Sequence, residues 1–156
     1  MSETITLPIA SISKRMSAFI IDDLVVALLI FIIFYEQFMQ IVLPLSGEIT
    51  VESIEIFQNS MHQFSVNNFV LIIALKILYH TVFIWQNGMT LGKYLTKIKV
   101  VSLDTELSPS LNKAFLRALL RILSEVVFYL GFLLAFFLPL KQTLHDKLSH
   151  CVVVDV

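Results

Sequence analysis

The chain has 156 residues, of which 57% are hydrophobic and 15% are charged, and its formal net charge is −1 at pH 7. A soluble domain has about 45–50% apolar and about 25% charged residues. The composition therefore argues against an ordinary soluble domain and indicates one integral membrane domain over residues 1–156. Cys151 is the only cysteine, which excludes an internal disulfide framework.

The first apolar run extends from about residue 16 to residue 36 and carries two adjacent carboxylates, Asp22 and Asp23. A cleaved signal peptide is the alternative for this segment. However, the acidic pair stands where a positive region should end, and no small-x-small cleavage pattern follows. We therefore expect a retained membrane helix.

Two further apolar runs, 68–86 and 111–140, are candidates for membrane spans, which need roughly 20 mostly apolar residues. As one helix, the run 111–140 would measure about 45 Å, which is long for one span and short for two. Two passes, or a re-entrant hairpin that bends near Gly131, are the alternatives. The sequence thus predicts a polytopic α-helical membrane protein with three or four membrane helices.

Charge predicts how these runs are oriented. The segment 37–67 contains acidic residues and neither Lys nor Arg, whereas Lys14 and Arg15 precede the first run and six basic residues lie within 87–121. The positive-inside rule then places the N-terminus and the segment 87–110 in the cytoplasm and makes 37–67 an outer loop. Because this rule accounts for the basic residues, nucleic-acid binding has no support.

The cytoplasmic segment should itself be structured. Leu91, Leu95 and Ile98 recur at i, i+4 and i+7, which predicts a small amphipathic helix on the membrane surface. The β-branched segment Ile98–Leu103 predicts a strand, and the tail 141–156 ends in a second one. Pairing of the two strands would place the tail inside, whereas three full spans would place it outside.

The carboxylates of the first run need partners. Asp22 lies about 9 Å from the start of the run, where burying a charge is costly. Arg15 is on the same helix face, and Lys76 and His80 form an i, i+4 pair at similar depth on the second run, where Glu125 could join them. Such a cluster would serve either as a structural clasp between helices or as an ion or proton site.

Other polar residues are weaker candidates. His145, Asp146 and His150 resemble a metal site, but their spacing is not a helical i, i+4, and we expect no metal, no cofactor and no catalytic residues. Four basic residues could contact anionic lipid headgroups or instead pair with Asp104, Glu106 or Asp146. These lipid or anion contacts are Lys93, Lys97, Arg117 and Arg121.

Three blocks together resemble the RDD family of bacterial membrane proteins. They are KRMSAFIIDD, WQNGMTLGKYLTKIKVVSLDTELSPSLNKAFLRALLR and LKQTLHDKLSHCVVV. The resemblance assigns the family's arginine to Arg15 and its two aspartates to Asp22 and Asp146. Its G-x-T-x-G-K stretch matches Gly88, Thr90, Gly92 and Lys93. The tail departs from the pattern, because His150 and Cys151 stand where the family often has a small residue and Thr.

The resemblance implies a bacterial inner-membrane location and suggests transport. We therefore expect a transport-related protein, which could be coupled to cations or protons, in which Asp22 is the charged site within the bilayer and Lys76 and His80 tune it. It would act as a homo-oligomer or with a membrane partner. The alternative is a non-transporting assembly or regulatory subunit. In either case Arg15, Asp22 and Asp146 could form a latch near the inner surface.

Overall fold

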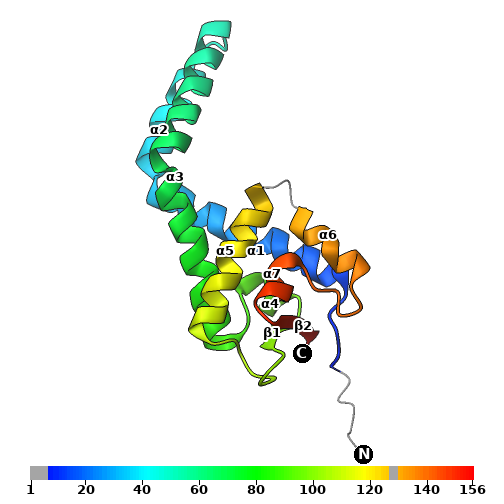
Figure 1. The fold of residues 1–156 in the computed structure, drawn as a ribbon. Coiled ribbons are helices and arrows are strands. Elements are labelled where there is room, and N and C mark those ends of the chain that lie inside the picture. Colours follow the sequence, from blue (N-terminus) through cyan, green and yellow to red (C-terminus); the bar gives the residue numbers. More distant parts are fainter. Residues whose placement is uncertain (1–6, 127–129) are drawn as a thin grey trace, which may run out of the picture. The chain divides into compact units, whose positions relative to one another are not determined.

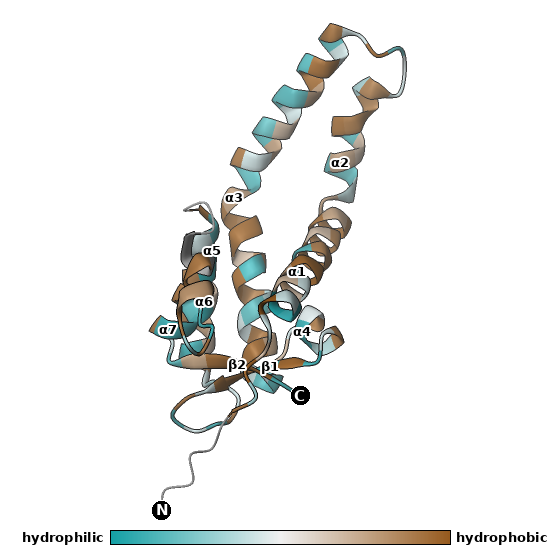
Figure 2. Cartoon of the chain, turned by 90° about the vertical axis from the view of Figure 1, so that its right-hand side faces the viewer, coloured by the Kyte–Doolittle hydropathy of each residue, from teal (hydrophilic) through white to brown (hydrophobic). Residues whose placement is uncertain are grey.

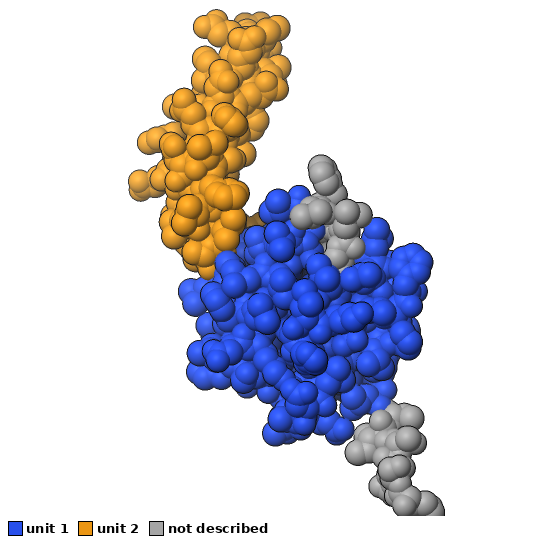
Figure 3. Space-filling view, viewed as in Figure 1, with its two compact units in different colours: residues 1–25, 76–156 blue, residues 26–75 orange. Residues whose placement is uncertain are grey.

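The structure is a computed structural model that describes residues 7–126 and 130–156, and it is mostly helical with one small sheet (Figure 1). Its elements, in chain order, are α1 (Ile12–Ile33), α2 (Tyr35–Val42), a 3-10 turn η1 (Leu43–Leu45), α3 (Val51–Asn87), α4 (Leu91–Leu95), β1 (Ile98–Ser102), α5 (Leu111–Val126), α6 (Leu130–Phe137), α7 (Leu144–Leu148) and β2 (Cys151–Asp155). They form two compact units (Figure 3). Unit 1 comprises residues 1–25 and 76–156, and unit 2 comprises residues 26–75.

Two of the described helices, α1 and α3, are long and apolar enough to cross a membrane. The predicted third run is divided between α5, with 16 residues, and α6, with eight, and each is shorter than a span of roughly 20 residues. In Figure 1, α5 and α6 run in opposite directions. The bend expected near Gly131 falls next to residues 127–129, which lie outside the described residues.

The buried face of α5 explains why this run is not a simple apolar span. Its large apolar residues are exposed, as at Leu119 and Leu123, while small and charged residues face the protein. The buried residues of α5 are Ala114, Arg117, Ala118, Arg121 and Ser124. Small residues allow close helix packing in membranes, and intramembrane charges face the protein interior.

The segment 37–67, which we expected to be an outer loop, is largely helical. The segment contains most of α2 and the first part of α3, and only residues 43–50 separate the two helices. Phe57, Met61 and Phe64 recur on one face and pack with Phe34 and Phe38 in the core of unit 2. Polar residues concentrate in this part of α3, which extends the helix well beyond its apolar part (Figure 2).

The sheet of unit 1 confirms the predicted pairing of the two strands. β1 and β2 are antiparallel, with Val100 opposite Val153 and Ser102 opposite Cys151. Ile9 adds a single bridge to Val154 on the other edge of β2. β2, in the tail, therefore lies beside β1, which follows α3 and α4 along the chain, and both strands belong to unit 1.

The expected amphipathic helix is shorter than predicted. α4 ends at Leu95, and Lys97 adopts a left-handed conformation with φ = 55° that turns the chain into β1. Ile98 is fully buried in the core of unit 1, whereas Leu91 and Leu95 are exposed. The pairing of β1 with β2 thus overrides the helical period at Ile98.

Candidate functional site

Asp22 is fully buried in unit 1, and its carboxylate accepts hydrogen bonds from four donors. Its Oδ1 accepts from the Tyr79 hydroxyl at 2.9 Å and from the Gly92 amide at 2.8 Å. Its Oδ2 accepts from the Thr90 hydroxyl at 2.6 Å and from the Lys93 ammonium at 3.4 Å. These five residues are named the Asp22 cluster.

The Asp22 cluster explains the spacing of the G-x-T-x-G-K stretch. Thr90, Gly92 and Lys93 direct a hydroxyl, an amide and an ammonium to the same carboxylate. Gly88, with φ = 69°, forms the turn before them, and its carbonyl accepts a hydrogen bond from the Val100 amide at 2.8 Å. A side chain at Gly88 would strain this left-handed turn and meet the Val100 carbonyl.

The expectation that Lys76 and His80 bind Asp22 was wrong, whereas the expected approach of Glu125 to Lys76 is confirmed, and it is Asp23 that belongs to this group. Lys76 Nζ lies 2.5 Å from Glu125 Oε2. Arg121 pairs with Asp23 at 2.9 Å and with Glu125 at 3.1 Å. Asp23, Lys76, Arg121 and Glu125 are named the Glu125 cluster.

His80 is buried but belongs to neither cluster. Its Nε2 has no hydrogen-bond partner among the described residues. Tyr79, the residue before it, takes the place beside Asp22 that we expected His80 to occupy. Adjacent residues on a helix point about 100° apart, so the two side chains cannot share one partner in this way.

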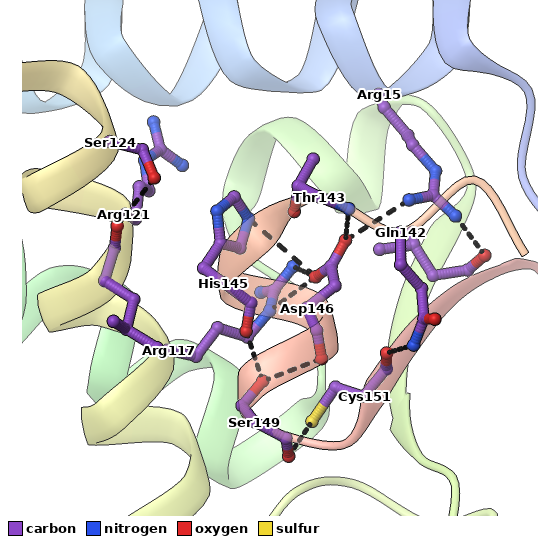
Figure 4. A network of polar contacts seen from close by, with 12 residues as sticks. Arg15, Arg117, Arg121, Ser124, Gln142, Thr143, His145, Asp146, Ser149 and Cys151 are labelled. Atoms are coloured by element: carbon purple, nitrogen blue, oxygen red, sulfur yellow. Dashed lines mark hydrogen bonds and ion pairs between the residues drawn. The ribbon is translucent and has the colours of Figure 1, made fainter. Parts of the chain in front are cut away.

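Asp146 is the centre of a third group, the Asp146 cluster, with Arg15 and Arg117 (Figure 4). Arg117 donates from Nε at 2.9 Å and from Nη2 at 2.5 Å to Asp146 Oδ1. Arg15 Nη1 and the Thr143 amide each lie 3.3 Å from Oδ2. Arg15 also donates to the carbonyls of Lys141 and Val153. The Arg15–Asp146 contact of the expected latch is present, but Asp22 lies in a separate cluster.

Burial and charge shift the pKa values of groups in α4 and α7. Burial would raise the pKa of Asp146, but the neighbouring charges, Arg117 foremost, override it and hold this pKa below its ordinary value. Burial lowers the pKa of His145 to about 3, against the opposing effect of Asp146. Burial also lowers the pKa of Lys93 to about 8, although Asp22 opposes this shift. At neutral pH, Asp146 is therefore ionised and His145 is neutral.

A cavity of about 580 Å³ lies inside unit 1 between these clusters. Its charged lining consists of four cations, Arg15, Lys93, Arg117 and Arg121, and one carboxylate, Asp146. The polar wall also includes His80 and His145. The remaining lining is mostly apolar and comes from α1, α3, β1, α5, α6 and β2. Its apolar residues are Ile12, Met16, Phe19, Ile20, Ile84, Ile98, Ala114, Ala118, Leu133, Ala135, Phe136 and Val153.

The expected lipid or anion contacts divide into two groups. Lys93, Arg117 and Arg121 are buried and line the cavity rather than the membrane surface, and Lys97 is exposed at the turn before β1. His145 is buried whereas His150 is exposed, so the two do not meet Asp146 on one face. Within 7–126 and 130–156, no three His, Cys, Asp or Glu side chains are placed to hold a metal ion.

Sequence reasoning missed Tyr79, Thr90 and Gly92 as partners of Asp22. The signal was the stretch that follows the second membrane run, because a turn at Gly88 brings the chain back against α1, where Thr90 and Gly92 meet Asp22. A search for donors in that turn, rather than only at matched depth on the next helix, would have found Thr90 and Gly92.

Comparison with known proteins agrees with the resemblance seen in the sequence. The family model described as the RDD family matches residues 9–150, a range that includes Arg15, Asp22 and Asp146. No curated protein and no solved structure matches the chain. The matched region also contains both helices that are long and apolar enough to cross a membrane. The chain therefore belongs to the RDD family and has the character of a membrane protein.

Proposed function

We propose that this RDD protein is a transport-related, multi-pass protein of the bacterial inner membrane, with a cytoplasmic N-terminus, and that the cavity of unit 1 receives its solute. The observation that carries the proposal is the cavity itself. Ligand sites typically occupy about 300–1,000 Å³ and combine apolar walls with a few polar groups. This cavity, of about 580 Å³, has that size and that lining.

Asp22 has a structural role in this proposal. An ionised carboxylate offers about four lone-pair positions, and four donors already approach the two oxygens of Asp22. A cation would have to displace at least one of them. The expected coupling of cations or protons at Asp22 therefore receives no support from the geometry, and four of the five charged groups that line the cavity are basic.

The alternative is an assembly or regulatory subunit that does not transport, in which the buried charges only hold the helices together. The multiple hydrogen bonds to Asp22 and Asp146 favour this alternative, because interhelical polar contacts stabilise membrane bundles. A homo-oligomer or a membrane partner is compatible with either function.

Transport can be measured in phosphatidylcholine proteoliposomes. We would follow Na⁺, protons, inorganic phosphate and a fluorescent phosphatidylglycerol placed in one leaflet. The proposal predicts that the wild type moves at least one of these probes faster than protein-free vesicles do. Leu133→Trp, which fills a position on the cavity wall, should slow that movement at least tenfold.

The matched control is Leu123→Trp on α5, since Leu123 is 54% exposed, similar to Leu133 at 51%, but does not line the cavity. This variant should move the probe as the wild type does. Equal rates for wild type, Leu133→Trp and protein-free vesicles with every probe would refute transport and leave the assembly role. In that case a defined partner should co-purify with the wild type and be lost from Asp22→Asn.

A further inference from the structure

The three charge clusters do not balance. The Asp22 cluster pairs one carboxylate with one ammonium, and the Glu125 cluster pairs two carboxylates with two cations. The Asp146 cluster has two guanidinium groups, Arg15 and Arg117, and a single carboxylate. Together the three clusters therefore carry an excess of one positive charge, located at the Asp146 cluster. An uncompensated buried charge is costly, so a bound monoanion would stabilise this arrangement.

The cavity also presents polar atoms without protein partners. Nε of Arg15 and Nε2 of His80 are buried and have no hydrogen-bond partner among the described residues, and both side chains line the cavity. Buried polar groups normally have partners, so these atoms indicate a ligand with oxygen acceptors.

The apolar side of the cavity reaches the surface of unit 1. Four of its lining residues are more than half exposed, which places them at the mouth of the cavity. They are Met16 and Ile20 on α1 and Leu133 and Phe136 on α6. In a membrane protein such exposed apolar side chains suit contact with acyl chains. An inorganic anion would use the cationic end and leave this mouth unoccupied.

We propose that the cavity binds an oxyanion carried on an acyl chain, with the headgroup against Arg15, Arg117 and His80 and the chain leaving between α1 and α6. A fatty carboxylate and the phosphodiester of an anionic phospholipid share this chemistry and the single negative charge. This inference rests on the cavity of the proposed function and names its substrate class. The headgroup neutralises the excess charge of the Asp146 cluster, and the chain covers the apolar mouth.

Binding can be measured without transport, by native mass spectrometry of the purified full chain released from a neutral detergent. The probes are phosphatidylglycerol, oleate, zwitterionic phosphatidylcholine and inorganic phosphate at equal concentrations. We expect one phosphatidylglycerol or one oleate per chain, bound at least tenfold more tightly than phosphatidylcholine. A preference for one of the two identifies the source of the oxyanion. Binding of inorganic phosphate alone, or equal binding of both phospholipids, would overturn the inference.

Two variants test separately the part of the cavity that would hold the headgroup and the part that would hold the acyl chain. His80→Leu replaces the imidazole with an apolar side chain of similar size and breaks no described hydrogen bond, so the variant should fold. It should bind the anionic probe several-fold more weakly. Leu133→Trp should reduce binding at least tenfold, whereas Leu123→Trp should leave it unchanged. Wild-type affinity in both His80→Leu and Leu133→Trp would contradict the site. Binding without movement in proteoliposomes would refute the transport proposal and leave this inference intact.

Discussion

Gly92 packs so closely against α1 that a Cβ atom on it would stand 2.2 Å from the carbonyl oxygen of Ala18. The same Cβ would lie 2.9 Å from Asp22 Oδ1, which accepts a hydrogen bond from the Gly92 amide. The contact between α1 and α4 therefore depends on the absence of a side chain at this position. It joins α1 to the turn that follows α3.

Gly92→Ala should destabilise unit 1, because the backbone of α1 would have to move away and the hydrogen bond to Asp22 would lengthen. Overpacking of this kind costs about 1–3 kcal/mol. The measurement is the thermal unfolding midpoint of the detergent-purified protein. Gly47→Ala is the matched control, since a Cβ at Gly47 would meet nothing within 4 Å. Equal midpoints for the two variants would contradict the close packing.

Asp22→Asn should lower the yield of folded protein, because it leaves the buried Lys93 without its carboxylate. Breaking a buried ion pair from one side costs about 3–5 kcal/mol. Asp23→Asn should have the smaller effect, since the Asp23 side chain is 31% exposed. Size-exclusion chromatography of detergent-extracted protein checks both. A wild-type yield of monodisperse Asp22→Asn protein would show that Asp22 is not a structural clasp.

His145 should make the protein sensitive to acid. Burial lowers the pKa of His145 to about 3 from an ordinary value of 6.5. At a pH between these two pKa values, the unfolded chain therefore binds a proton on His145 that the folded chain does not. Stability therefore rises with pH across this window and is lost as the pH falls below about 6.5. Between pH 6.5 and 4.5 the loss should be about 2 kcal/mol.

The test is unfolding in detergent at pH 6.5, 5.5 and 4.5. His145→Gln should weaken the dependence, whereas His150→Gln, at an exposed position, should leave it unchanged. Asp146 does not contribute to this slope above pH 4, because its lowered pKa affects stability only below its ordinary 3.8. An identical slope in His145→Gln and wild type would show that His145 is not buried as a neutral group.

Cys151 should be protected from a membrane-impermeant maleimide in both intact and lysed spheroplasts and should react only after denaturation. Its side chain is fully buried in β2, and burial raises the pKa of its thiol. The side of the membrane on which the tail lies is better measured in two double variants. Each carries Cys151→Ser together with either Val156→Cys or Leu103→Cys. Because β1 pairs with β2, both engineered cysteines should label on the same side of the membrane. Labelling on opposite sides would contradict the sheet.

The sequence was sufficient for features that depend on local pattern. The apolar run from residue 16 predicted α1 closely, and the β-branched segments at Ile98 and Cys151 predicted a strand pair. In the segment 37–67 only the charges were weighed, so the helical period at Phe57, Met61 and Phe64 was not recognised.

The partners of the buried charges were harder to predict, for a geometric reason. Depth in the membrane places Asp22 and His80 at one level but says nothing of the rotation of each helix about its axis, and it is Tyr79 that faces Asp22. The cavity was out of reach of the sequence, because α5, α6 and α7 approach α1 only through tertiary packing. The sequence suggested Arg117 as one of several partners for Asp146, but it did not indicate that Arg117 lines a cavity.

The measurement that tests the central claim most directly is photo-crosslinking of wild-type protein in phosphatidylcholine vesicles with a photoreactive fatty acid, followed by peptide mapping. If the cavity of unit 1 takes an acyl-chain oxyanion, the adducts should concentrate on residues 12–20 and 133–136, which line it. An excess of phosphatidylglycerol or oleate should compete for them, and phosphatidylcholine should not. Adducts spread over the exposed apolar faces of α1 and α3, without competition, would contradict the account.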